Sequence, residues 1–195
     1  EEDIIASAKT ICKRYKGNQA HAEYLEQMAG KFFDLLQKYH GLGERERLLL
    51  RLAAILHDCG KFISMSAPGE CAYQIIMSTE ILGISHMERE MVASIVRYNT
   101  MELPNFSEFD GKLGNDEYLI VMKLAAILRV CNALDRSHRQ KFADMKLTIK
   151  DSNIVITTAY PDNITLEKKT LQDKQDFFEE VYGLGFEIKQ KKKKQ

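Results

Sequence analysis

The stretch from residue 48 to residue 58, LLLRLAAILHD, decides how the rest of the chain is interpreted. Its first nine residues are apolar apart from Arg51, which predicts a helix buried at the centre of a larger assembly. His57 and Asp58 follow directly at its end, and a neutral imidazole beside a carboxylate can hold one divalent metal ion. A helix-capping histidine followed by an aspartate in a turn is the plainer interpretation of the same pair.

Helical spacing of apolar residues extends outward from this stretch over most of the chain. The side chains recur every three or four positions, which is the repeat of an amphipathic helix. Asn18 is a suitable N-cap for one helix, and Ser85 with Glu88 forms a capping-box pattern before another. Residues 100–115 are rich in turn formers and predict a loop. We therefore expect helices over residues 4–15, 22–39, 48–56, 72–82, 86–97 and 116–139.

Alternation of apolar and polar residues replaces the helical spacing near the C-terminus. Two alternating runs separated by a turn signal at residues 151–153 predict a β-hairpin. The expected elements are strands over 145–149, 154–158, 164–167 and 186–188, and a helix over 170–181. The predicted fold class is mostly α, with a helical bundle over residues 1–141, a small α+β appendage over 142–190 and a basic tail over 191–195.

The composition is that of an ordinary globular protein. The chain has 195 residues, 45% of them hydrophobic, with 28 Lys+Arg balanced by 28 Asp+Glu. Because the formal net charge is zero, any site for a polyanion must be a local patch. No apolar run approaches the length of a membrane span, so no membrane contact is expected.

The cysteines form no C-x-x-C pair, which argues against a structural zinc site. Free thiols and the absence of a signal peptide predict a cytoplasmic protein. The helical pattern starts at once, with no initiator Met, so we expect a fragment of a longer protein. The four cysteines are Cys12, Cys59, Cys71 and Cys131.

The order of the polar residues resembles the HD-type phosphohydrolases, all-helical enzymes whose metal ligands run His, His-Asp, Asp. His21 lies on the predicted helix before His57, where the first ligand is expected. A closer resemblance is to the C-terminal region of the exopolyphosphatase / guanosine pentaphosphate phosphatase (Ppx/GppA) family. Five stretches carry it in the family's order: AHAEYLEQMAGKFFDLL, LLRLAAILHDCGKFIS, AYQIIMSTEILGISHMEREMVASIVRYN, KLAAILRVCNALDRSH and DFFEEVYGLGFEI.

This resemblance implies an HD-domain-like bundle that is not catalytic by itself. In the family, two N-terminal domains of actin-like ATPase fold carry hydrolysis, and the C-terminal domain helps to bind polyphosphate and to form a dimer. The expected partners are therefore the N-terminal domains, a polyphosphate or similar polyanion, and a second copy of the chain. No Gly-rich phosphate loop occurs here, since Gly41-Leu42-Gly43 matches neither phosphate-loop pattern.

The sequence departs from the metal-binding HD pattern at three places. Cys71, Asn99 and Asn132 stand where the resemblance implies stronger ligands, and a neutral amide brings no charge to a cation. His21, His57 and Asp58 remain as a degenerate metal site. We expect no cofactor in this chain, with a bound divalent metal ion as the alternative; the resemblance implies Mg²⁺ or Mn²⁺ for the parent enzyme.

Two further interpretations of these polar residues stay open. Asp135, three residues beyond Asn132, could supply the missing carboxylate. His21, His57 and Asp58 could also form a hydrogen-bonded polar cluster within the core, completed by Asn.

Basic residues supply the candidate polyanion contacts. Arginine suits bidentate binding of phosphate, and a polyanion would be held by many charge-assisted contacts that weaken with salt. The alternative is that these residues pair with Glu80, Glu88, Asp58 or Asp135. The candidates are Arg51, Lys61, Arg97, Arg129, Arg136, His138 and Arg139.

Three functions follow from these observations. The first is an accessory, polyphosphate-binding and dimerising domain of an exopolyphosphatase-like phosphohydrolase. The second is an active metal-dependent HD phosphohydrolase acting on a nucleotide or another phosphate ester. The third is a purely structural interaction domain. Within the first, polyphosphate and a guanosine polyphosphate are both possible ligands.

Overall fold

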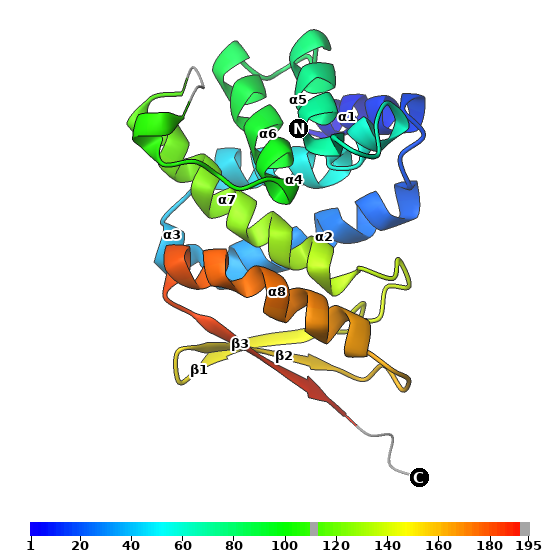
Figure 1. Ribbon diagram of the computed structural model, residues 1–195, viewed down its shortest axis with the longest axis vertical. Helices are drawn as coiled ribbons and strands as arrows, with labels where there is room; N and C mark the ends of the chain where they lie inside the picture. The colour runs from blue at the N-terminus through cyan, green and yellow to red at the C-terminus, as the bar shows by residue number, and fades with distance from the viewer. Residues whose placement is uncertain (110–112, 192–195) are drawn as a thin grey trace.

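The computed structural model describes residues 1–109 and 113–191, which fold into a helical bundle with a small sheet below it (Figure 1). The helices are α1 (Glu2–Arg14), α2 (Gln19–Leu35), α3 (Gln37–His40), α4 (Glu44–Leu56), α5 (Pro68–Ser78), α6 (His86–Thr100), α7 (Asn115–Leu134) and α8 (Thr165–Tyr182). The strands are β1 (Lys146–Lys150), β2 (Asn153–Thr158) and β3 (Gly185–Gln190), and two 3-10 turns are η1 (Cys59–Phe62) and η2 (Phe106–Glu108). This confirms the predicted mostly helical fold with an α+β appendage.

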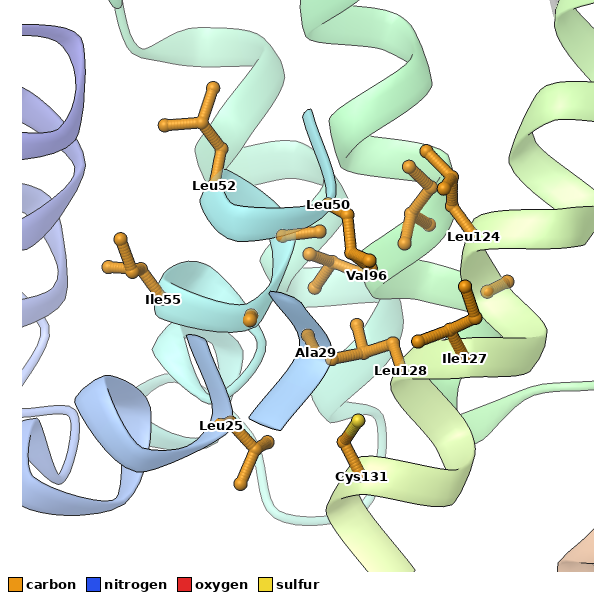
Figure 2. Close-up of a cluster of buried hydrophobic side chains, with 14 of the residues drawn as sticks. Leu25, Ala29, Leu50, Leu52, Ile55, Val96, Leu124, Ile127, Leu128 and Cys131 are labelled. Carbon is orange, nitrogen blue, oxygen red and sulfur yellow. The ribbon is translucent and has the colours of Figure 1, made fainter. Parts of the chain in front are cut away.

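Helix α4 is the central helix, as its apolar sequence predicts. It packs against α1, α2, α6 and α7, and every residue from Leu48 to Leu56 except Arg51 is buried. Figure 2 shows Leu50 of α4 among apolar side chains that include Ala29 of α2, Val96 of α6 and Leu128 of α7. Burial of this apolar surface is the main stabilising contribution to the bundle.

Two helix starts follow the predicted capping chemistry. The Asn18 side chain accepts a hydrogen bond from the His21 backbone N–H at 3.1 Å and so starts α2. Ser85 and Glu88 form the reciprocal capping box of α6, with hydrogen bonds of 3.1 and 2.7 Å. Each pair satisfies backbone donors that the first turn of a helix leaves unpaired.

Three helix boundaries differ from the sequence prediction. Helix α5 begins at Pro68, which suits a first helical position, and ends at Ser78 rather than 82. The apolar stripe expected to run to residue 39 breaks at Leu36, where the short α3 begins. Helix α7 ends at Leu134 rather than near 139, because Asp135 turns the chain and binds the Gln140 backbone N–H at 2.8 Å.

The sheet has the order β1-β2-β3. Strands β1 and β2 form the predicted antiparallel hairpin, with Lys150 opposite Asn153. The two residues between them, Asp151 and Ser152, have φ angles of 49° and 59°. This is the left-handed backbone that a tight two-residue hairpin requires. Strand β3 then pairs parallel to β2 after the chain crosses over through α8.

The strand predicted over residues 164–167 is wrong. Ile164 precedes α8 and Thr165 begins it. Ile164, Glu167, Leu171 and Phe178 are all buried, so this segment continues a helical stripe rather than an alternating one. A four-residue run of alternating character fits either pattern, and the longer stripe identifies it as helical.

The predicted division near residue 141 remains a prediction. Helix α8 packs directly along α7 and lies between the bundle and the sheet (Figure 1). Apolar residues of the appendage, such as Ile154 and Phe178, belong to the same buried cluster as the helices. Of the predicted tail, residues 192–195 lie outside the described residues. No helix in the described part of the chain is long and apolar enough to cross a bilayer.

Candidate functional site

The structure brings His21, His57 and Asp58 together, as the sequence predicted. His21 lies in the first turn of α2 and His57 directly follows α4, and both are buried. Their ring centroids are 4.9 Å apart with the rings edge to face. The Asp58 side chain is 11% exposed, so this polar cluster sits just beneath the surface at one end of the bundle.

The buried carboxylate of Asp135 orients His21. The sequence offered Asp135 only as a spare ligand or ion-pair partner. Asp135 Oδ2 lies 2.6 Å from His21 Nδ1, and neither side chain is more than 1% exposed. A carboxylate can only accept here, so Nδ1 carries the proton in the neutral ring and Nε2 keeps its lone pair. Among the described residues, His21 Nε2 has no hydrogen-bond partner.

His57 is oriented in the same way by the backbone. Its Nδ1 donates to the Ala54 carbonyl oxygen at 2.7 Å. This leaves Nε2 with a lone pair in the neutral ring. That atom lies 3.1 Å from Asp58 Oδ1, within ion-pair distance but without the geometry of a hydrogen bond. Two groups with lone pairs therefore face each other unless a proton or another cation lies between them.

Asp58 is ionised at this position. Burial by itself would raise the pKa of its carboxyl group. His57 and the Lys61 ammonium, which lies 2.7 Å from Asp58 Oδ1, outweigh burial and hold the pKa well below its usual range. The cluster thus contains a carboxylate that is paired with the Lys61 ammonium.

His138, predicted as a phosphate contact, belongs to the same cluster. Its ring stacks on His21 with centroids 3.8 Å apart and planes 16° from parallel, and its Nδ1 lies 3.4 Å from the Asn18 side-chain amide. Candidate ligand atoms of His21, Asp58 and His138 all lie within 4.8 Å of one another. Burial and the neighbouring His21 lower the pKa of His138, against the opposing pull of Asp58 and Asp135.

The loop that carries His138 is anchored from both sides. Asp135 binds the Gln140 backbone N–H at one end, and Glu167 of α8 accepts from the Ser137 hydroxyl and backbone N–H. His138 and Gln140 have φ angles of 54° and 51°. Such left-handed angles cost energy for residues other than glycine. The anchors therefore hold a strained loop against the polar cluster.

Glu167 was missed because its segment was predicted as a strand. Its carboxylate is fully buried and lies 3.0 Å from the Lys141 ammonium. Lys141 also donates to the Asn163 carbonyl oxygen at 2.8 Å. A buried ion pair of this kind is costly to break, so it fixes the end of the loop to the appendage.

Most of the predicted polyanion contacts on the helices are already engaged by the protein. Arg51 pairs with Glu26 at 2.7 Å and also contacts Glu1. Arg97 pairs with Glu70 at 2.8 Å. These are the carboxylate pairings that the sequence offered as the alternative, although the partners differ from those expected.

Arg129 and the loop arginines differ from that group. Arg129 donates to the Tyr98 carbonyl oxygen at 2.7 Å, also contacts the Met101 carbonyl, and lies over the Phe177 ring. Arg136 and Arg139 are exposed, and among the described residues neither side chain has an ion pair or hydrogen bond. Within the described part of the chain, two unpaired guanidinium groups therefore lie on the two sides of His138 in this loop.

Asn99, Cys71 and Asn132 stand where the resemblance implied stronger metal ligands, and their surroundings differ from one another. Asn99 is buried at the end of α6, and neither of its side-chain polar atoms has a hydrogen-bond partner in the described part of the chain. It lines a cavity of about 260 Å³ together with Arg129 and Phe177. Cys71 is half-buried on α5, and Asn132 is half-buried on α7.

Comparison with known proteins identifies the chain. Domain III of the Ppx/GppA phosphatase family matches residues 5–176. This chain belongs to the Ppx/GppA family. The match confirms the resemblance to the family's C-terminal region and makes the chain a phosphatase-related domain.

A curated relative agrees with this assignment. The chain is 23% identical over 164 residues to the guanosine-5'-triphosphate,3'-diphosphate pyrophosphatase of Vibrio atlanticus (strain LGP32). The aligned region is 80% of this chain and 31% of that enzyme, so the chain spans about a third of its relative's length.

The site of this Ppx/GppA domain combines two kinds of chemistry side by side. The buried cluster presents imidazole lone pairs and a carboxylate, which attract a cation. The adjoining loop presents two exposed guanidinium groups, which attract an anion such as phosphate. His138 lies at the boundary between the two.

Proposed function

We propose that this chain is an accessory domain of a Ppx/GppA phosphatase that binds a polyphosphate chain or a similar polyanion, contributes to a dimer, and performs no hydrolysis itself. Hydrolysis would be carried by N-terminal domains of the parent enzyme, with the actin-like ATPase fold that the family resemblance implies. The proposal places the protein in the cytoplasm, and four cysteines without disulfides are in keeping with that.

The observation that carries the proposal is the loop from residue 136 to residue 139. It presents Arg136 and Arg139 to solvent on both sides of His138, and its backbone is held by Asp135 and Glu167. A fixed loop loses little conformational entropy on binding, so its arginines are prepared for a ligand with repeated negative charge. The helix arginines already paired with carboxylates would contribute less.

An exposed apolar patch supports a contact with another domain or a second copy. Phe62, Ile63 and Met65, which follow the polar cluster, are 52%, 59% and 77% exposed. Adjacent exposed side chains of this size are unusual on a surface that faces only water. We assign this patch to the interface with the rest of the parent enzyme.

Binding is tested with fluorescently labelled inorganic polyphosphate and anisotropy at low and high salt. The double variant Arg136→Ala/Arg139→Ala should weaken binding by roughly a hundredfold or more, since it removes two charged hydrogen bonds of about 1.5–3 kcal/mol each. Affinity of the unchanged chain should fall with added salt. Competition with guanosine pentaphosphate would separate the two ligand classes.

The matched control removes the same charge elsewhere. Lys146 and Lys150 are exposed on β1, away from the loop, so Lys146→Ala/Lys150→Ala should bind nearly as well as the unchanged chain. Equal weakening in both double variants would mean a diffuse charge effect and would contradict a site in the loop. No binding at low salt would favour a purely structural interaction domain.

Dimer formation is measured separately by light scattering on the chain and on a Phe62→Ser/Met65→Ser variant. A dimer that dissociates in the variant would place this patch in a contact between copies. A monomer at all concentrations would remove dimerisation from the proposal and leave the patch for the parent's other domains.

Metal-dependent hydrolysis is the second candidate, favoured by the Nε2 atoms of His21 and His57, which lack partners among the described residues, beside an ionised Asp58. It is tested by turnover of phosphate esters with Mn²⁺ or Mg²⁺. Activity that disappears in His57→Ala would replace the accessory role. Absence of turnover with every metal would support the accessory role.

A further inference from the structure

The polar cluster contains more nitrogen donors than a degenerate HD site needs. Its side chains come from three separate segments: His21 from α2, Asp58 from the turn after α4, and His138 from the loop after α7. Candidate ligand atoms of these three residues lie within 4.8 Å of one another. Two imidazoles and one carboxylate are a ligand set typical of zinc.

His21 is already arranged as a metal ligand. Its Nδ1 is held by Asp135 at 2.6 Å, and its Nε2 is buried with a lone pair and no partner among the described residues. A carboxylate on the far nitrogen is the usual second-layer support of metal-bound histidines, because it fixes the tautomer and the ring orientation. A buried acceptor without a donor is unfavourable, and a bound cation would satisfy it.

Asp58 supplies the negative charge. Its Oδ1 lies 2.7 Å from the Lys61 ammonium, with which it forms an ion pair. The Lys61 side chain is 36% exposed. Because its stem is flexible, the ammonium can turn into solvent when another cation takes its place. Lys61 is therefore a competitor for the same carboxylate.

His138 supplies the third ligand and the route of entry. It is the exposed member of the three, on a loop held by Asp135 and Glu167 in a left-handed conformation. Its ring stacks on that of His21 with centroids 3.8 Å apart, and its candidate ligand atom lies within 4.8 Å of those of His21 and Asp58. Backbone strain at a residue held by its surroundings often accompanies a binding role.

We propose that His21, Asp58 and His138 bind one borderline transition-metal ion, with Zn²⁺ as the probe, and that the ion joins the 135–141 loop to the bundle. Hard ions such as Mg²⁺ prefer all-oxygen ligands and would bind this nitrogen-rich set poorly. His57, whose Nε2 also lacks a partner among the described residues, lies at the edge of the cluster as a neighbouring nitrogen. This metal site is independent of the accessory function proposed above.

Isothermal titration calorimetry on chelator-stripped chain tests the site. We expect one Zn²⁺ per chain with a Kd of about 1 μM or tighter, and no comparable heat from Mg²⁺. Cobalt substitution should give a visible absorption band of a low-coordinate nitrogen and oxygen site. Zinc binding weaker than about 0.1 mM would overturn the proposal.

Variants locate the ion. His138 is exposed, so His138→Ala should fold, weaken Zn²⁺ by at least about tenfold and abolish the cobalt band. His86→Ala removes an exposed histidine from α6 and should change neither. Lys61→Ala removes the competing ammonium and should tighten Zn²⁺ roughly two- to fivefold, the size of one partly exposed ion pair. Unchanged binding in His138→Ala, or equal losses in both histidine variants, would refute the site.

The polyphosphate assay, run separately with a chelator present, keeps the two proposals distinguishable. Failure of zinc binding would leave polyphosphate binding by Arg136 and Arg139 unaffected. Loss of polyphosphate binding would likewise leave the calorimetric result on Zn²⁺ intact.

Discussion

Leu50 lies on α4 and His57 directly follows that helix, but the surroundings of the two residues differ. Leu50 lies among apolar side chains of α2, α6 and α7 at the centre of the bundle (Figure 2). His57 lies about two turns further along, among His21, Asp58 and the residues that contact them. Apolar neighbours are largely interchangeable, whereas a buried polar group needs one partner at one distance. Substitutions in the apolar surroundings of Leu50 and in the polar cluster around His57 should therefore differ in how much stability they cost and in how that cost depends on pH.

The largest loss of stability is expected in the polar cluster around His21 and His57. Asp135→Ala removes the partner of His21 Nδ1 and of the Gln140 backbone N–H together. Leaving buried groups unpaired should lower the free energy of unfolding by about 3–5 kcal/mol. Urea denaturation measures this. The exposed control, Asp162→Ala, should change the free energy of unfolding by less than about 0.5 kcal/mol. A similarly small loss in Asp135→Ala would contradict the expected difference between the polar cluster and the surface.

The apolar centre should follow closely. Leu50→Ala leaves a cavity among α2, α6 and α7 and should cost about 3 kcal/mol of unfolding free energy. No titrating group is involved, so the loss should be the same at pH 5 and pH 8. Leu82, which is 73% exposed, provides the control substitution to alanine. A pH-dependent cost at Leu50 would show that the two regions are coupled.

A smaller loss is expected where the polar loop joins the appendage. Glu167→Gln keeps an acceptor for Ser137 but removes the charge opposite Lys141. Losing this charged hydrogen bond should lower the free energy of unfolding by about 2 kcal/mol. Glu180→Gln on the exposed side of the same helix should cost little. Equal stability of the two variants in urea would mean that water, rather than Glu167, satisfies Lys141.

The smallest effect is expected at the surface. The Arg45 hydrogen bond, with the Ser85 backbone and hydroxyl, lowers the pKa of Glu88 from 4.5 to about 2. Because the pKa of Glu88 is lower in the folded state, its ionised form stabilises the fold fully above pH 4.5. This contribution disappears as the pH falls toward 2. Glu88→Gln should cost about 0.5–1 kcal/mol at pH 6. The gap in urea midpoints should close on acidification, and a gap that widened would contradict this assignment.

The features predictable from sequence are those set by periodicity or by neighbours in the chain. The buried helix over 48–56, the Asn18 and Ser85 caps and the hairpin at Asp151 depend on residues within a few positions of one another. The meeting of His21 with His57 and Asp58 was predictable because the family order of ligands implies it.

The features that were missed depend on distant partners. Asp135 and His21 are 114 residues apart, and the sequence offered Asp135 only as a spare ligand or ion-pair partner, not as the hydrogen-bond partner of His21 Nδ1. The same aspartate ends α7 early by binding Gln140, although the helical spacing continues past it. Glu167 looks like an exposed strand residue until Ser137 and Lys141 are placed beside it.

The parallel pairing of β2 with β3 sets the order in which the molecule can be completed. Strand β2 emerges from the ribosome well before β3, and all of α8 must be made between them. The helices through α7 are already synthesised by then and can begin to pack. The edge of β2 that faces β3 therefore keeps its backbone donors and acceptors open to water until β3 has been synthesised.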